Sequence, residues 1–202
     1  MLMVAALALT SCGENGSESS SLNDKLSTLY KLVQNRDRQA AIEIFRTINP
    51  DQLTSLEAKL LEDTIKDFKA ELSTQHYLEG LDQLKNEDYT TAIKSFRASL
   101  KLNNNAVHAT AVKIHMANAT RLLGNPQEAI ALLQQLITAH TDRTLSDDAH
   151  WYLALSHFEA QQHDQAGTVL KNLMKRFPDS QYFRPARIRV EELNRAHNSS
   201  TI

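Results

Sequence analysis

Histidine is the residue type that most readily suggests chemistry in this chain, since eight histidines accompany a single cysteine in 202 residues. His150 and His157 are seven residues apart, so on one helix they share a face but lie about 10 Å apart along the axis. That separation is too large for one metal ion. The His-Glu-x-x-His arrangement of zinc proteases is absent, and a lone cysteine cannot build a soft-metal site. We therefore predict no metal site and no cofactor.

Other catalytic patterns are missing too. There is no Gly-x-Ser-x-Gly nucleophile elbow, no P-loop and no dinucleotide-binding glycine pattern, and five glycines leave little material for one. Asp147 and Asp148 are adjacent, so on a helix their side chains diverge by about 100°. They are better explained as first-turn charges that the helix dipole favours. The sequence therefore predicts that the protein is not an enzyme.

The single cysteine, Cys12, ends an apolar N-terminal segment. The apolar run from Leu2 to Leu9 is too short to span a bilayer but has the size of a signal-peptide core. Leu9-Thr10-Ser11-Cys12 resembles the lipobox of bacterial lipoproteins, whose cysteine receives lipid. No Lys or Arg precedes the run, and an incidental apolar terminus is the alternative. We predict that residues 1–12 are a lipoprotein signal peptide and that Cys12 is the lipid attachment site.

A polar segment follows the cysteine. Residues 13–21 are rich in Gly and Ser, which cannot bury apolar area, so we expect a flexible tether. Glycine after the lipidated cysteine resembles the lipoproteins that are exported to the outer membrane. The predicted location is therefore a bacterial cell envelope, lipid-anchored, with the protein on the outer membrane and facing the periplasm.

A repeat of 37 residues organises the rest of the chain. Ala92, Ala129 and Ala166 are spaced by this period, and each is followed four and eight residues later by a bulky apolar side chain. Twelve residues before each alanine comes a small residue; these are Gly80, Ala117 and Ala154. Self-similarity at such a period, with helical spacing, is typical of a solenoid whose repeats bury their apolar faces by stacking.

The composition agrees with one helical domain. Hydrophobic residues make up 42% of the chain, charged residues 23%, and no useful stretch alternates with a period of two. We predict an all-α fold, a right-handed α-solenoid of antiparallel helix pairs with about ten helices. Capping patterns and the repeat phase place these helices, with a break near Ser73, at 22–35, 38–48, 54–71, 73–86, 89–102, 106–122, 126–140, 147–160, 163–176 and 182–196.

The repeat also predicts the domain organisation. Ala41 and Phe45 imitate Ala92 and Phe96, so residues 22–72 are interpreted as a degenerate repeat plus an extra helix. Three repeats at 73–180 follow. A C-terminal capping helix at 181–197 and a disordered tail at 198–202 complete the chain.

These residues resemble the tetratricopeptide repeat family. Gly80, Tyr89, Ala92, Phe96 and Leu100 match the family pattern in one unit, and later units repeat it at Gly124, Asn125, Ala129, Ile130, Trp151, Leu153, Ala154, Phe158, Ala166 and Pro178. The period is 37 instead of the family's 34. The ending Phe177-Pro178-Asp179-Ser180 is similar to periplasm-facing repeat lipoproteins of the outer-membrane assembly and Tol-Pal systems.

The resemblance implies a binding groove. In the family, the first helix of each unit lines the concave side, and carrying the phase over predicts a partner-binding groove. Its residues are Tyr77, Leu81, Lys85, Ile114, Asn118, Arg121, Trp151, Leu155 and Glu159, with Leu84, Leu122 and Phe158 beside them. Apolar anchors with a few charges suit the capture of a peptide or helix, although any of these side chains could instead belong to the core.

The predicted function is a non-enzymatic, membrane-anchored scaffold or adaptor that binds a partner protein or peptide in envelope assembly, division or secretion. The alternative is a periplasmic lipoprotein that binds glycan or peptidoglycan or assists a hydrolase. A net charge of −2 gives no reason to expect nucleic acid. Residues 91–202 carry 13 Lys or Arg and 9 Asp or Glu, which indicates either a solvated face or a docking patch for an acidic partner.

Overall fold

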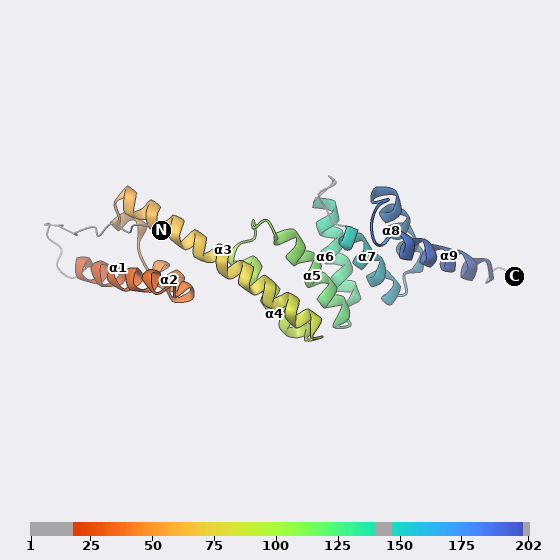
Figure 1. Cartoon of the computed structure of the whole chain (residues 1–202), viewed down its shortest axis with the longest axis horizontal. Coiled ribbons are helices and arrows are strands. Elements are labelled where there is room, and N and C mark those ends of the chain that lie inside the picture. Colours follow the sequence, from red (N-terminus) through yellow and green to blue (C-terminus); the bar gives the residue numbers. More distant parts are fainter. Residues whose placement is uncertain (1–17, 140–146, 200–202) are drawn as a thin grey trace. The chain divides into compact units, whose positions relative to one another are not determined.

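The computed structural model describes residues 18–139 and 147–199, and Figure 1 shows the course of the chain. Within these residues the secondary structure is helical, with no strand, which confirms the all-α prediction. The elements are α1 (Glu18–Gln34), α2 (Arg38–Phe45), the 3-10 helix η1 (Pro50–Gln52), α3 (Ser55–Lys85), α4 (Tyr89–Leu102), α5 (Ala109–Leu122), α6 (Pro126–Ala139), α7 (Asp147–Glu159), α8 (His163–Arg176) and α9 (Phe183–Ser199). Cys12 and the predicted signal peptide lie outside the described residues.

The chain divides into two compact units, Met1–Phe68 and Lys69–Ile202, with the boundary inside α3. In the first unit α1 packs on α2, and the Lys25 ammonium donates a 2.9 Å hydrogen bond to the Thr47 carbonyl. The core of this unit consists of the buried side chains of Leu29, Ala41, Ile42, Ile48, Ile65 and Phe68. Ala41, the predicted small residue of a degenerate repeat, is fully buried in this core.

The two terminal helices are longer than composition suggested. α1 begins at Glu18, inside the segment 13–21 that was expected to be a tether, and α9 reaches Ser199, inside the expected tail. No Gly or Pro lies between Glu18 and Gln34 to stop the first helix, and an acidic residue at its start is favoured by the helix dipole.

α3 runs without interruption from Ser55 to Lys85, so the predicted break near Ser73 is wrong and two expected helices are one. Its start has the expected capping box, since the Thr54 N–H donates to the Glu57 carboxylate at 2.9 Å and the Glu57 N–H donates to the Thr54 hydroxyl at 3.3 Å. No proline interrupts the helix. Ser73 marks a helix contact, because its hydroxyl donates to the Ser99 carbonyl at 3.0 Å and the Ser99 hydroxyl donates to the Ser73 carbonyl at 2.7 Å.

In the second unit the helices stack in sequence, and α5 also contacts α7. Three apolar clusters join them. The first cluster links α4 and α5 to the second half of α3 through Phe96 and Val112. The second joins α5, α6 and α7 through Leu133 and Leu153, and the third joins α7, α8 and α9 through Leu170. Each cluster therefore contains side chains from neighbouring repeats, as stacking of repeats requires.

The small residues of the repeat lie where helices cross. Ala92, Ala117, Ala129, Ala154 and Ala166 are all fully buried. Gly80 faces Phe96 so closely that an added Cβ would lie 2.5 Å from ring atom Cε1. Side chains at such crossings must be small for two helix axes to approach to about 8–10 Å.

Glu191 interrupts the series of small residues. It lies on α9, 37 residues after Ala154, and its side chain is 52% exposed and forms ion pairs with Arg187 and Arg195 at 3.8 and 3.7 Å. The phase still holds in α9, because Ala186 is fully buried like Ala149, 37 residues earlier. α9 therefore corresponds to the first helix of a repeat, with a charged residue at the position where the earlier first helices carry Gly or Ala.

The turns inside the repeats share one backbone geometry. Glu87, Gly124 and Gln161 are 37 residues apart and have φ of 62°, 89° and 60°. The next residue in each case bonds back to the carbonyl five residues earlier, as in Asp88 to Gln83 at 2.9 Å, which is a left-handed C-cap. Arg36, with φ of 53°, makes the same turn between α1 and α2, so the first pair of helices follows the repeat plan.

Candidate partner-binding face

The first helices of the three repeats are the second half of α3, α5 and α7. We call the side of these helices that carries Tyr77, Arg121 and Asp148 the first-helix face. α5 and α7 contact each other directly, so the face is continuous from the second repeat to the third. The same three helices carry the residues predicted to line a groove.

On α3, the predicted residues lie at the edge of the core. Tyr77 and Leu81 pack against the cluster around Phe96, as does Leu84. The Tyr77 ring stacks on His108, with centroids 5.2 Å apart and planes 7° apart. Lys85 is exposed at the end of the helix. Lys85 is therefore the most accessible of these side chains, while Tyr77, Leu81 and Leu84 are each half-buried.

On α5, two predicted residues are buried. Ile114 is 2% exposed and packs in the cluster around Leu133, so it is a core residue. Asn118 is 7% exposed, and its Oδ1 accepts hydrogen bonds from Arg121 Nε at 3.2 Å and Nη2 at 2.8 Å. Its amide orients the arginine and does not face outward. Leu122 is 38% exposed beside them.

An ion pair joins two repeats across the face. Arg121 Nη1 on α5 donates to Glu159 Oε1 on α7. The Arg121 side chain is 10% exposed and that of Glu159 is 43% exposed, so the guanidinium is held beneath the surface by both Asn118 and Glu159. The structure thus brings together three of the predicted residues from two helices.

Trp151 packs against the cluster around Leu170. Its indole stacks on Tyr182, the residue just before α9, with centroids 4.9 Å apart and planes 8° apart. Leu155 is half-buried one turn further along α7. Trp151 therefore contributes both to the core and to the face, and one side of its ring is already covered by Tyr182.

Asp148 is a residue of this face that the sequence prediction missed. Its Oδ1 accepts a 2.6 Å hydrogen bond from the Tyr182 hydroxyl, while the neighbouring Asp147 accepts one from Ser180. The two carboxylates are adjacent in sequence but have different partners. The 37-residue period could have identified it. Asp148 on α7 occupies the position of Ala111 on α5 and of Thr74 on α3, so the three residues lie on the same side of their helices.

The electrostatics of the face centre on Asp148. Burial raises the pKa of Tyr77 and of Tyr152, and in both cases the charge of Asp148 adds to the rise. Burial and the hydrogen bond to Asp148 raise the pKa of Tyr182 strongly. Burial lowers the pKa of His115, and Asp148 opposes this. These tyrosines are therefore neutral, and the charge of Asp148 affects groups on α3, α5 and α7.

One contact has the residue types of nucleophilic catalysis. The Ser73 hydroxyl lies 3.3 Å from His108 Nε2. Ser73 is fully buried, however, and its hydroxyl also donates to the Ser99 carbonyl at 3.0 Å. Because this oxygen is buried, the serine and histidine are interpreted as a packing contact: the bonds to Ser99 join α3 to α4, and His108 lies at the start of α5.

Within 18–139 and 147–199, no three His, Cys, Asp or Glu side chains gather where they could hold a metal ion. None of the helices in these ranges is both long and apolar enough to cross a membrane.

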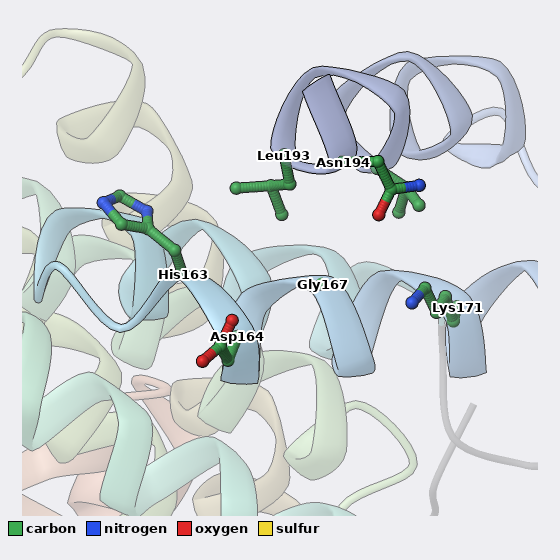
Figure 2. Close-up of a pocket in the computed structure, with 7 residues that line it drawn as sticks. His163, Asp164, Gly167, Lys171, Leu193 and Asn194 are labelled. Carbon is green, nitrogen blue, oxygen red and sulfur yellow. The ribbon is translucent and has the colours of Figure 1, made fainter. Parts of the chain in front are cut away.

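A cavity of about 460 Å³ lies between α8 and α9. Figure 2 shows His163, Asp164 and Lys171 on α8 and Leu193 and Asn194 on α9, with Gly167 between them. An added Cβ at Gly167 would lie 3.3 Å from Leu193 Cδ1, so the glycine allows the two helices to approach. His163, Asp164, Lys171 and Asn194 are exposed, so this cavity is an open surface cleft.

Comparisons with known proteins agree with this architecture. Residues 69–197 match the family model described as YfiO, outer membrane lipoprotein. Comparison with curated proteins gives no match. The Arabidopsis OM64 TPR domain is similar with a TM-score of 0.53 and 15% identity, covering 63% of this chain and 98% of that one. The TPR2AB domain of yeast Sti1, in a complex with pHSP90, has a TM-score of 0.54 and 15% identity, covering 88% and 81%. The tetratricopeptide fold is thereby confirmed.

Proposed function

Because this chain belongs to the YfiO family of outer membrane lipoproteins, we propose that it is a non-enzymatic scaffold, lipid-anchored at Cys12, that binds a partner protein or peptide in envelope assembly, division or secretion. The tetratricopeptide fold supports this proposal. Arrays of helix pairs present extended surfaces to other chains. The outer membrane, with the protein facing the periplasm, is the proposed location.

The observation that carries the proposal is the composition of the first-helix face. The first helices of three successive repeats, α3, α5 and α7, contribute partly buried aromatic and charged side chains there, among them Tyr77, Arg121, Asp148 and Trp151. Their positions are held by ring stacking, by an ion pair between repeats and by the Tyr182 hydrogen bond. A preorganised surface of this kind loses little side-chain entropy when a partner binds.

Fractionation tests the anchor. The wild-type protein is expected in the membrane fraction of a bacterial cell, and Cys12→Ser in the soluble fraction, because more than one acyl chain is needed for stable anchoring and the lipid-bearing cysteine supplies them. If the two proteins fractionate alike, the proposed lipid attachment is wrong.

Photo-cross-linking tests the face. A photoreactive amino acid at Lys85 or at Leu122, both exposed on first helices, is expected to give the same discrete adduct in cells. Lys94, exposed on the second helix α4, is the matched control and is expected to give none. Equal adducts from all three positions would show that the first-helix face is not the binding surface.

Glycan binding is a second candidate, favoured by the stacked Trp151 and Tyr182 rings, since aromatic faces also suit sugars. Co-sedimentation with purified peptidoglycan checks it. Retention of the wild-type protein and release of Trp151→Ala would promote this function over capture of a protein.

A further inference from the structure

The third repeat departs from the first two at the cleft between α8 and α9. Ile93 on α4 and Ile130 on α6 are 37 residues apart, and each is 7% exposed. Ile93 packs in the cluster around Phe96, and Ile130 packs in the cluster around Leu133. The next position in this series, on α8, is Gly167. The third repeat therefore lacks the aliphatic side chain that packs between a second helix and the following first helix in the earlier repeats.

A leucine on the opposite helix replaces only part of the missing side chain. α9 carries Leu193 where α5 has Ala119 and α7 has Ser156. A Cβ added to Gly167 would lie 3.3 Å from Leu193 Cδ1, so the leucine lies over the glycine. Leu193 is nevertheless only half-buried, and a cleft of about 460 Å³ remains beside it (Figure 2). Ligand pockets commonly measure about 300–1,000 Å³, so this volume suits a short segment of chain.

Polar side chains of both charges lie at the edges of the cleft. Asp164 and Lys171 are seven residues apart on α8 and both line the cleft, so they lie about 10 Å apart along the helix axis. Asn194 lines the cleft from α9. The side chains of these three residues form no hydrogen bond or ion pair with the rest of the described chain. All three are therefore available to a ligand.

The spacing of these groups matches an extended peptide. In an extended chain, side chains two and four residues apart point to the same face, and four residues advance about 13 Å. Long charged side chains at the two ends of such a segment can lean inward to reach Asp164 and Lys171. The middle side chain then points into the cleft beside Leu193, at the place where the earlier repeats supply isoleucine.

Asn194 favours an extended segment over a helical one. Its amide offers both an acceptor oxygen and donor hydrogens, which suit the N–H and C=O groups of a peptide backbone. A helix uses these groups internally. We propose that the cleft binds an extended segment of another protein in which an aliphatic residue is flanked, two residues away on each side, by one basic and one acidic residue.

The basic side chain pairs with Asp164 and the acidic one with Lys171. The site is formed by a second helix and α9, and so it is separate from the first-helix face. The inference therefore goes beyond the proposed function, and either can fail without the other.

Nuclear magnetic resonance with a synthetic peptide tests the site. The isotopically labelled full chain carrying Cys12→Ser is titrated with acetyl-Lys-Ser-Leu-Ser-Glu amide. Saturable shifts are expected at the backbone amides of Gly167, Leu193 and Asn194. Serine in place of the central leucine of the peptide should weaken binding about tenfold, because the aliphatic side chain no longer leaves water. Lysine in place of the terminal glutamate should weaken it too, because that end then meets Lys171.

A double variant gives the third repeat the side chains of the first. Gly167→Ile together with Leu193→Ala places isoleucine on α8 and alanine on α9, as at Ile93 and Ala119. The cleft is then filled from within. Peptide binding is expected to be lost, while the free energy of unfolding, measured by urea denaturation, stays near that of the wild type.

Single charge variants test the ends of the cleft. Lys171→Gln should weaken binding about two- to fivefold at low salt, as loss of one exposed ion pair implies, and Asp164→Asn should have a similar effect. Lys175→Gln is the matched control, because Lys175 is exposed one turn further along α8 and does not line the cleft.

Shifts that do not saturate, or equal affinity for the leucine and serine peptides, would overturn the inference. Equal losses in Lys171→Gln and Lys175→Gln would also overturn it, and this comparison decides even where the double variant does not fold. Shifts of the Gly167 amide that depend on protein concentration without peptide would assign the cleft to a second copy of the chain instead. Peptide binding without cross-linked adducts at Lys85 and Leu122 would keep the inference and remove the first-helix face.

Discussion

Gly80 and Phe96 are in contact at the crossing of α3 and α4, and a Cβ added to the glycine would lie 2.5 and 2.6 Å from two ring atoms. Phe96 is fully buried, so its ring cannot move aside into solvent. Alanine in place of glycine usually stabilises a helix by about 0.5–1 kcal/mol. Overpacking of a core typically costs about 1–3 kcal/mol, and at this distance the second effect should be larger.

We therefore expect Gly80→Ala to lower the free energy of unfolding by about 1–2 kcal/mol, measured by urea denaturation. The double variant Gly80→Ala, Phe96→Leu should lose less than the sum of the single changes, because the smaller side chain leaves room for the methyl group. A Gly80→Ala protein as stable as the wild type would show that α3 and α4 can separate at little cost.

The left-handed turns predict opposite effects of two substitutions at equivalent positions. Glu87 has φ of 62° and Gly124 has φ of 89°, a region that costs residues other than glycine about 1–2 kcal/mol. Glu87→Gly should raise the free energy of unfolding by about 0.5–1 kcal/mol, and Gly124→Ala should lower it by about 1 kcal/mol. Nothing lies within 4 Å of a Cβ at Gly124, so its effect is one of backbone strain. Shifts of the same sign would contradict this account.

The ion pair between Arg121 and Glu159 should couple two repeats energetically. A double-mutant cycle with Arg121→Leu and Glu159→Gln is expected to give about 0.5–1 kcal/mol, decreasing with salt. The pair of Arg97 and Glu128 is the matched control, because it also joins two repeats but its atoms are 3.8 Å apart and its side chains are 65% and 54% exposed. Its coupling should be near zero. Equal coupling in both pairs would mean that burial of Arg121 contributes nothing.

His115 should make stability depend on pH. In the folded chain, burial lowers the pKa of His115 below its ordinary value of 6.5. The unfolded chain therefore takes up a proton first as the pH falls. Stability is then lost below about pH 6.5, with a slope smaller than the roughly 1.4 kcal/mol per pH unit of one whole proton. Urea denaturation between about pH 7.5 and 5.5 should show a smaller loss for His115→Gln than for wild type. Identical slopes would assign the dependence to other groups.

The second helices were the easiest elements to predict. The expected bounds of 89–102 and 163–176 agree with α4 and α8, because a left-handed turn or a capping residue precedes each helix. Asp88, for example, accepts a hydrogen bond from the Thr91 N–H at 3.1 Å. The break expected near Ser73 failed for a physical reason, since the repeat marks a helix contact at that point and the backbone needs no interruption to make it.

The candidate site was less accessible to sequence reasoning. The repeat phase identified the helices of the face, but it could not separate core from surface within them, as the burial of Ile114 and Asn118 shows. Asp148 appeared as one of two equivalent first-turn charges. Asp148 differs from Asp147 because it accepts the hydrogen bond of the Tyr182 hydroxyl. Tyr182 lies 34 residues later in the sequence, and only the packing of α9 on the preceding repeat brings the two residues together.

Glu191 bears on how such an array could lengthen by duplication. A copied second helix that packed on α9 as α4 packs on α3 would bring its counterpart of Phe96 against this carboxylate instead of against a small residue. The charge and its two arginine partners would then be buried without water, at considerable cost. A second helix packed on α9 in this way would therefore need Gly or Ala in place of Glu191. A single acidic side chain thus acts as a barrier to evolutionary growth of the array at α9.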